Sequence, residues 1–137
     1  MKRVIFACVH NAGRSQMAAA FFNRLADPEL ASAASAGTAP GAVIHPEVAE
    51  VMLEVGIDLS GTTPQKLTPQ LAQGAAHLIT MGCGESCPVV PGARVHDWPV
   101  EDPKGKSAER VRQIRDEIGD RVARFVTDEG WAATASS

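Results

Sequence analysis

Cys8 and Arg14 are the first residues whose types and spacing could do chemistry. Five residues separate them, and Ser15 follows Arg14 directly. A cysteine can act as a thiolate nucleophile, and the planar guanidinium of an arginine can hold two oxygens of a tetrahedral oxyanion at once. The pattern therefore predicts attack by Cys8 on an oxyanion that Arg14 holds.

The elements expected around this pair strengthen the interpretation. An apolar run over Val4–Cys8 is typical of a buried strand, and apolar residues at steps of three and four over Arg14–Ala26 indicate a helix. In open α/β sheets, ligands bind at the carboxyl ends of strands, where Cys8 would lie. The N–H groups there would favour a thiolate over a thiol. We expect the loop that binds the oxyanion to consist of Val9, His10, Asn11, Ala12, Gly13 and Arg14.

Individual side chains of this segment have separate expected roles. The Ser15 hydroxyl is placed to hydrogen-bond the sulfur of Cys8, and Asn11 tolerates left-handed backbone angles that would brace the loop. His10 is interpreted as a solvent-facing residue, not as a catalytic base. Spacing alone leaves a structural cysteine followed by a surface arginine as an alternative, because such a short pattern arises easily by chance.

Cys83 and Cys87 form a second group. They follow a strand expected over Ala75–Met81, so they would lie at the same edge of the sheet as Cys8. Cysteines four positions apart can come within disulfide distance in a tight loop. Glycines flank Cys83 on both sides and leave the backbone free to move its sulfur. We interpret the two cysteines as a redox pair.

Two alternatives remain for this cysteine pair. One is a zinc site that His77, His96 or Cys8 would complete, since zinc sites use cysteines at this spacing. The other is a loop without function. The sequence has no second closely spaced Cys/His pair, and His77 stands in an apolar run where a core histidine is the simpler interpretation, so we predict no metal.

A third group is the acidic segment from Asp97 to Gly105, which follows a strand expected over Arg94–Asp97. When a thiolate expels an oxygen from an oxyanion, a nearby protonated carboxyl can supply the proton. Asp102 is the candidate acid, and Glu101 and Asp97 are its competitors. An Asp-Pro pair is also common at turns.

Apolar periodicity divides the rest of the chain into alternating strands and helices. A further strand is expected over Ala31–Gly37. Helices are expected after His45-Pro46 with Gly56 as the C-terminal stop, over Thr68–Gln73 and over Ser107–Thr127. This alternation implies βαβ units. The predicted fold class is α/β, a three-layer α/β/α sandwich with a four-stranded parallel sheet. One domain is expected over residues 1–130, with a flexible tail over residues 131–137.

The composition argues against several function classes. The sum of 13 Lys and Arg against 16 Asp and Glu is −3, without the basic excess of nucleic-acid or anionic-membrane binders. No apolar run in the sequence approaches the about 20 residues of a membrane span, and the N-terminal apolar stretch is too short for a secretory signal. Three cysteines do not make a secreted disulfide framework. We therefore expect a cytoplasmic protein with reactive cysteines.

Four motifs follow one another along nearly the whole chain: Cys8-x5-Arg14-Ser15-Gln16-Met17-Ala18, Ser35-Ala36-Gly37, Cys83…Cys87-Pro88 and Trp98…Asp102-Pro103. Together they resemble the arsenate reductases built on the low-molecular-weight tyrosine phosphatase fold. The resemblance implies that Cys8 is the nucleophile, that Arg14 and the loop amides bind arsenate, that Ser15 tunes the thiolate, and that Asp102 is the general acid. Cys83 and Cys87 match the two resolving cysteines of the thioredoxin-coupled branch, which form a disulfide relay with Cys8.

The resemblance also implies what else the protein needs. It implies an external reductant, thioredoxin or a low-molecular-weight thiol, and no tightly bound cofactor. Asn11 matches an asparagine that helps some members hold a potassium ion, whereas Ala19 stands where a supporting glutamate is expected. Three alternatives stay open: a phosphatase without a redox step, an arsenate reductase that uses mycothiol or glutathione with a glutaredoxin-type partner, and a non-catalytic oxyanion or metal sensor.

Overall fold

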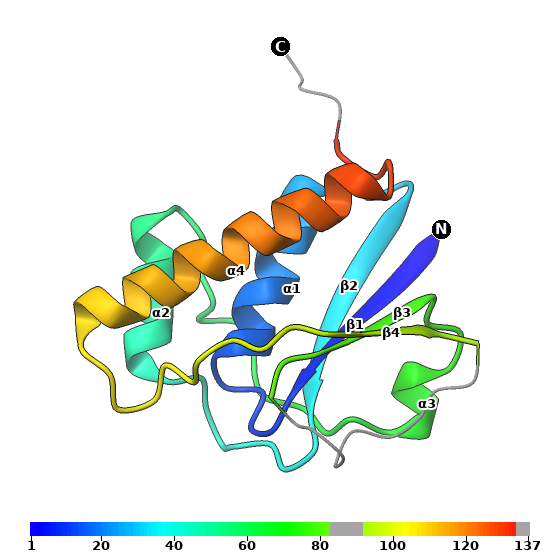
Figure 1. Ribbon diagram of the computed structural model, residues 1–137. Coiled ribbons are helices and arrows are strands. Elements are labelled where there is room, and N and C mark those ends of the chain that lie inside the picture. Colours follow the sequence, from blue (N-terminus) through cyan, green and yellow to red (C-terminus); the bar gives the residue numbers. More distant parts are fainter. Residues whose placement is uncertain (83–91, 134–137) are drawn as a thin grey trace.

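The computed structural model describes residues 1–82 and 92–133. Within them a parallel sheet has four strands in the order β2-β1-β3-β4 (Figure 1). The strands are β1 (Lys2–Cys8), β2 (Ala31–Gly37), β3 (His77–Thr80) and β4 (Arg94–Asp97). The helices are α1 (Arg14–Leu25), α2 (Pro46–Glu54), α3 (Pro69–Ala72) and α4 (Ala108–Asp128).

Successive residues of β1 point to opposite faces of the sheet, as the geometry of a strand requires. Val4 and Phe6 belong to a core that includes residues of α1, α2 and α4. Ile5 and Ala7 belong to a smaller core that includes residues of α3. Helices therefore cover both faces, which confirms the predicted α/β class, although the layer on the α3 side is thin.

The boundaries of the elements follow local chemistry and lie close to the predicted ones. The hydroxyl of Ser107 accepts a hydrogen bond from the N–H of Arg110 and caps the start of α4. Pro46 stands in the first turn of α2, where a missing N–H costs nothing. β1 starts at Lys2, earlier than its apolar run, because its polar beginning still pairs with Ala31.

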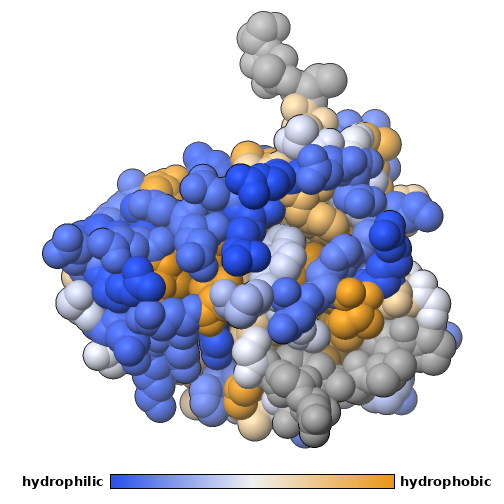
Figure 2. Space-filling view, in the orientation of Figure 1, coloured by the Kyte–Doolittle hydropathy of each residue, from blue (hydrophilic) through white to orange (hydrophobic). Residues whose placement is uncertain are grey.

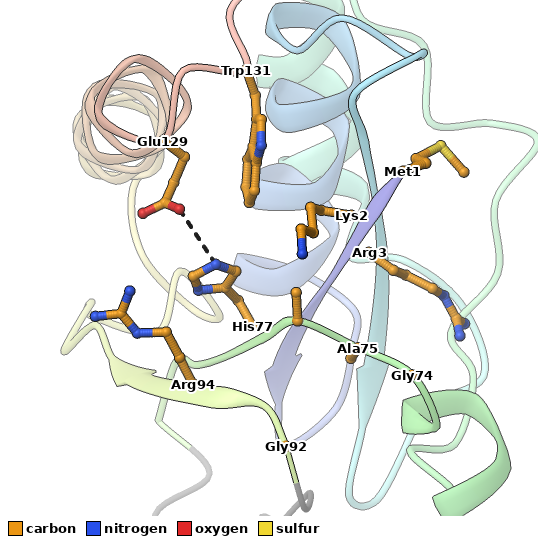
Figure 3. Close-up of a pocket in the computed structure, with 11 residues that line it drawn as sticks. Met1, Lys2, Arg3, Gly74, Ala75, His77, Gly92, Arg94, Glu129 and Trp131 are labelled. Carbon is orange, nitrogen blue, oxygen red and sulfur yellow. Dashed lines mark ion pairs between the residues drawn. The ribbon is translucent and has the colours of Figure 1, made fainter.

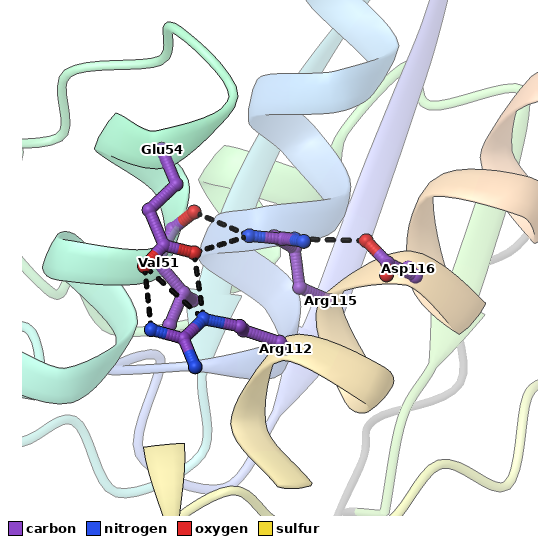
Figure 4. A network of polar contacts seen from close by, with 5 residues as sticks. All are labelled: Val51, Glu54, Arg112, Arg115 and Asp116. Carbon is purple, nitrogen blue, oxygen red and sulfur yellow. Dashed lines mark hydrogen bonds and ion pairs between the residues drawn. The ribbon is translucent and has the colours of Figure 1, made fainter. Parts of the chain in front are cut away.

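A buried arginine ties α2 to α4. Arg115 on α4 donates through Nη1 to the carbonyl of Val51 at 2.9 Å and to the carboxylate of Glu54 at 2.9 Å, both on α2 (Figure 4). The exposed Arg112 also donates to Glu54, at 2.8 Å. The hydrogen bond from Arg112 is the main reason that the pKa of Glu54 lies below its ordinary value. These contacts fix the two helices against each other.

The prediction of a flexible tail from residue 131 is wrong at its first residue. Trp131 is 9% exposed, and its indole contacts the rings of Phe22, His77 and Phe125. Figure 3 shows it beside His77. The carbonyl of Trp131 also accepts a hydrogen bond from the N–H of Asp27. The indole buries apolar area, so the packed fold continues past residue 130. Residues 134–137 lie outside the described residues.

The face of the molecule in Figure 2 is largely polar, and apolar side chains show on it in separate small areas. In the described part of the chain, no helix combines the length and the apolar character needed to cross a membrane.

Candidate active site

The sulfur of Cys8 lies at the carboxyl end of β1, buried among hydrogen-bonding groups. Ser15 Oγ lies 2.8 Å from Cys8 Sγ, and the N–H of Asn11 donates to the same sulfur at 3.3 Å. Asn11 Nδ2 donates to Ser15 Oγ at 2.7 Å, so the Ser15 hydroxyl keeps its own proton for the sulfur. These donors stabilise negative charge on Cys8, as a thiolate nucleophile requires.

The loop after Cys8 turns its carbonyl groups away from the site. The carbonyls of Cys8, Val9, His10 and Ala12 accept hydrogen bonds from N–H groups of the segment 38–45. The C=O and N–H of a planar trans peptide point in opposite directions, so the N–H groups that follow face the other side of the loop. The first N–H groups of α1 have no acceptor within their own helix. Together these groups make a cradle for an anion.

Two glycines let neighbouring segments approach this loop. A Cβ on Gly37 would lie 2.5 Å from the carbonyl oxygen of Val9 and 2.9 Å from the backbone nitrogen of Asn11, distances that real Cβ atoms do not adopt. The end of β2 can lie beside the loop because residue 37 has no side chain. A Cβ on Gly13 would lie 3.1 Å from Cγ of Pro103, so the loop is also close to the acidic segment.

The guanidinium of Arg14 reaches from the start of α1 to the acidic segment. Its Nη1 donates to the carbonyl of Val100 at 3.1 Å, and its Nη2 lies 3.8 Å from Oδ2 of Asp102. Gly82, which has a φ of +97°, leaves room for this guanidinium, because a Cβ there would collide with Nη1. An arginine in this position can bind two oxygens of an anion seated on the loop.

Asp102 is the candidate acid that the geometry favours. Its Oδ1 accepts a hydrogen bond from the N–H of Lys104 at 3.0 Å, which leaves Oδ2 directed to Arg14. The Asp102 side chain is 45% exposed, so solvent reaches it. The predicted acid therefore lies beside the predicted oxyanion-binding cation.

Glu101 and Asp97, the other two candidate acids, form hydrogen bonds with other residues. Glu101 accepts hydrogen bonds from Arg110 at 2.9 and 3.2 Å, and Arg110 is the main reason that the pKa of Glu101 lies below its ordinary value. Glu101 is therefore held ionised and is a poor proton donor. Asp97 accepts a hydrogen bond from the hydroxyl of Thr80 at 2.9 Å, within the β3–β4 pair.

The structure describes His10 and His77 but not Cys83 and Cys87. Cys83 and Cys87 lie outside the described residues, so their redox role stays a prediction. His10 is exposed and contacts the carbonyl of Ala39, as expected of a solvent-facing residue. His77 is 4% exposed within an aromatic cluster and is a core histidine, as predicted. Among the described residues, no group of three or more potential ligands could hold a metal ion.

The sequence pattern indicates no role for Gln16 or Gln65, but both contact Asn11 in the folded chain. The side-chain nitrogen of Gln16 donates to the backbone carbonyl and to the side-chain oxygen of Asn11, each at 3.1 Å. The backbone N–H of Gln65 donates to the same side-chain oxygen at 2.9 Å. In the sequence, only the Ser15-Gln16 pair directly after Arg14 points to this part of the site, and it does not reveal that Gln16 contacts Asn11.

This chain is similar to known proteins over most of its length. A profile of the family described as low molecular weight phosphotyrosine protein phosphatase matches residues 3–131. The chain belongs to this family. Within the family it is 40% identical over 121 residues to a putative arsenate reductase of Halobacterium salinarum, with 85% of each chain covered. It is 36% identical to the glutaredoxin arsenate reductase of a Synechocystis species, covering 92% of this chain and 97% of the relative.

A solved phosphatase-family structure extends the comparison. The thioredoxin-dependent arsenate reductase of Corynebacterium glutamicum superimposes with a TM-score of 0.80 at 36% identity. The match covers 93% of this chain, but this chain spans only 61% of the Corynebacterium chain. The predicted resemblance to the arsenate reductases of the phosphatase family is confirmed.

The potassium ion of some family members does not fit this chain. Ala19, at the position of the expected glutamate, offers no side-chain oxygen. The side-chain oxygen of Asn11 already accepts hydrogen bonds from Gln16 and from Gln65. Because hydrogen-bond donors occupy the oxygen that would hold the cation, we assign potassium no role in the reaction.

Proposed function

We propose that this chain reduces arsenate to arsenite with Cys8 as the nucleophile. The observation that carries the proposal is the sulfur of Cys8 in contact with Ser15 and with the N–H of Asn11, at the start of α1. A tetrahedral arsenate would bind to the free N–H groups of the loop and to the guanidinium of Arg14. The relatives named as arsenate reductases support this choice of oxyanion.

The first step is substitution at arsenic. The thiolate of Cys8 forms a bond to arsenic(V) while one As–O bond breaks. In its protonated form, Asp102 donates its proton to the departing hydroxyl oxygen, which leaves as water. Arg14 stays on the remaining oxygens and offsets their negative charge. No electrons have been exchanged at this stage, since arsenic is still in its +5 state.

Cys83 and Cys87 supply the two electrons. The thiolate of Cys83 attacks the sulfur of Cys8, the S–As bond breaks, and its electron pair goes to arsenic, which leaves as arsenite in the +3 state. Cys87 then attacks Cys83, which frees Cys8 and leaves a Cys83–Cys87 disulfide for an external dithiol to reduce. The cysteines carry both electrons, so the cycle requires no tightly bound cofactor.

A phosphatase acting on phosphotyrosine is less well supported. The six aromatic residues of the chain are four Phe and two Trp. All of them lie in the larger core or pack against it: Phe6, Phe21, Phe22, Trp98, Phe125 and Trp131. None of these six side chains is therefore fully exposed for stacking on an aryl ring, which suits a small inorganic oxyanion better.

Thioredoxin is the proposed reductant, because the Corynebacterium relative is named as thioredoxin-dependent. The test is arsenate-dependent oxidation of NADPH in the presence of thioredoxin and thioredoxin reductase. The parent chain is expected to turn over, and Cys8→Ser is expected to be inactive. Turnover by Cys8→Ser would contradict the assignment of the nucleophile.

A glutaredoxin-type reductant is the second candidate, because the Synechocystis relative is named as a glutaredoxin arsenate reductase at similar identity. The same assay, run with glutathione or mycothiol and a glutaredoxin in place of thioredoxin, separates the two. Under this alternative Cys87→Ser would keep its turnover, since the small thiol would replace Cys87 as the resolving group.

A further inference from the structure

Asn11 holds the conformation on which the Cys8 site depends. It is fully buried and has a φ of +51°, the left-handed region that costs a non-glycine residue energy. Asparagine tolerates this region better than most residues, and the buried contacts of Asn11 hold it there. The contacts of Asn11 therefore show what keeps the loop in shape.

Two backbone groups fix which way the amide of Asn11 faces. The backbone N–H of Gln65 can only donate, so the Asn11 side-chain atom 2.9 Å from it is the oxygen. The backbone carbonyl of Asn11 can only accept, so the Gln16 side-chain atom 3.1 Å from it is the nitrogen. That nitrogen also donates to the side-chain oxygen of Asn11, at 3.1 Å.

The orientation of Asn11 then decides the direction of the next two hydrogen bonds. With its oxygen held by Gln16 and Gln65, its nitrogen faces Ser15 Oγ at 2.7 Å and donates to it. Ser15 is thereby used as an acceptor on that side, and its proton is directed to the sulfur of Cys8 at 2.8 Å. Gln16 thus donates to Asn11, Asn11 donates to Ser15, and Ser15 donates to the sulfur of Cys8.

We propose that Gln16 is a positioning residue that, together with the backbone N–H of Gln65, sets the direction of this hydrogen-bond chain, so that it ends with a proton donated to the sulfur of Cys8. Gln16 touches no reacting atom and acts through Asn11 and Ser15. It is almost fully buried on the first turn of α1. The inference deepens the proposed function, because a thiolate at Cys8 is what the first step of arsenate reduction uses.

A substitution that changes one side-chain atom of Gln16 tests the direction of the hydrogen-bond chain. Gln16→Glu keeps the shape of the side chain, and as a carboxylate it replaces the donating nitrogen with an accepting oxygen, which would face two oxygens of Asn11. The repulsion favours the turned-over amide of Asn11 against the hold of the Gln65 N–H, and in that orientation Ser15 would donate to Asn11 in place of Cys8. Gln16→Met removes the donor without installing an acceptor, so it weakens the chain without reversing it.

The readout is the rate at which iodoacetamide alkylates Cys8 at neutral pH, in a Cys83→Ser, Cys87→Ser background where Cys8 is the remaining thiol of the chain. A hydrogen bond to the sulfur sets the expected scale, so Gln16→Glu should alkylate about fivefold to tenfold more slowly than its parent, with Gln16→Met in between. The matched control is Gln65→Met. It loses the side-chain hydrogen bond to the carbonyl of Ser35 but keeps the backbone N–H on Asn11, and it should react at the parental rate.

Thermal unfolding of the four proteins separates positioning from general destabilisation. The proposal is overturned if Gln16→Glu alkylates at the parental rate, or if Gln65→Met slows as much as Gln16→Met. Should Gln16→Glu fail to fold, the comparison of Gln16→Met with Gln65→Met decides. The alkylation assay contains no arsenate, so failure of arsenate turnover would refute the proposed function and leave this inference standing.

Discussion

Nη2 of Arg14 lies 3.8 Å from Oδ2 of Asp102. The group expected to hold the oxyanion and the group expected to protonate its departing oxygen are therefore neighbours in the folded chain, 88 positions apart in the sequence (102 − 14). A partly exposed ion pair adds little to stability. The contact matters because it brings a proton donor to the oxygens that Arg14 binds.

Asp102→Asn is expected to slow arsenate reduction by about 100-fold or more, the usual scale for loss of a general acid. The asparagine keeps the size of the side chain and its acceptor for the N–H of Lys104, so phosphate and arsenate should still bind. Steady-state kinetics, with phosphate as a competitive inhibitor, measures both quantities. Glu101→Gln is the control and should keep its activity. Parental turnover by Asp102→Asn would remove the acid role from this residue.

Cys87→Ser is expected to complete a single turnover and stop with a Cys8–Cys83 disulfide. Without Cys87 there is no neighbouring thiolate to attack Cys83, and thiol–disulfide exchange cannot proceed. Arsenite release and peptide mass mapping after one turnover check the result. Cys8→Ser should release no arsenite. Arsenite release by Cys87→Ser without the trapped disulfide would contradict the order of the relay.

Local patterns predicted the strand, loop and helix that carry Cys8, because burial of an apolar run and helical periodicity are properties of neighbouring residues. They also predicted the contact of Ser15 with the sulfur. The contact of Gln65 with Asn11 could not be predicted, since it joins residues 54 positions apart. It depends on how the segment after β2 returns to the loop, which only the packed fold determines.

The burial of Trp131 could not be predicted for the same reason, because it depends on contacts between distant segments. Small and polar residues follow it in the sequence, which is typical of a free end. Its burial depends on Phe22 of α1 and His77 of β3, which lie far from it in the sequence. A single apolar side chain near a terminus does not reveal whether a complementary surface exists.

Gly37→Ala is expected to weaken oxyanion binding and to destabilise the fold by about 1–3 kcal/mol, the usual cost of overpacking. Its Cβ would meet backbone atoms of Val9 and Asn11, which cannot move aside without deforming the loop. Urea unfolding and phosphate binding measure the two effects. Gly61→Ala is the matched control, because its Cβ would meet no atom within 4 Å. If both variants behaved alike, the close approach at Gly37 would not matter.

Arg115→Met is expected to destabilise the protein by about 1–3 kcal/mol through loss of charged hydrogen bonds, because the buried guanidinium donates to Val51 and Glu54. Arg112→Met should leave stability unchanged within error, since Arg112 pairs with Glu54 on the exposed surface. Chemical denaturation of both variants tests the contrast. Equal losses would show that burial of Arg115 is not the deciding feature.

Stability is also expected to depend on pH through two histidines. His77 Nδ1 and His96 Nε2 lie 2.9 Å apart, in a hydrogen bond that needs at least one ring without a charge. Burial, the largest cause, lowers the pKa of both below the ordinary value of 6.5, and nearby Arg94 adds to the effect. Glu129, 3.6 Å from His77 Nε2 (Figure 3), opposes the lowering for both rings.

The direction in which stability changes with pH follows from proton uptake by His77 and His96. Below about pH 6.5 the unfolded chain binds protons on both histidines more readily than the folded chain does, so stability should fall as the pH drops from about 6.5 toward the lowered native values. Above that range the histidines should contribute no pH dependence. Urea unfolding at a series of pH values measures the slope, and His77→Gln, which can still hydrogen-bond His96, should flatten it. A slope unchanged in His77→Gln would assign the acid sensitivity to other groups. The carboxylates of Glu54 and Glu101, whose pKa values are also lowered, lose their contribution only at more acidic pH, as they are protonated.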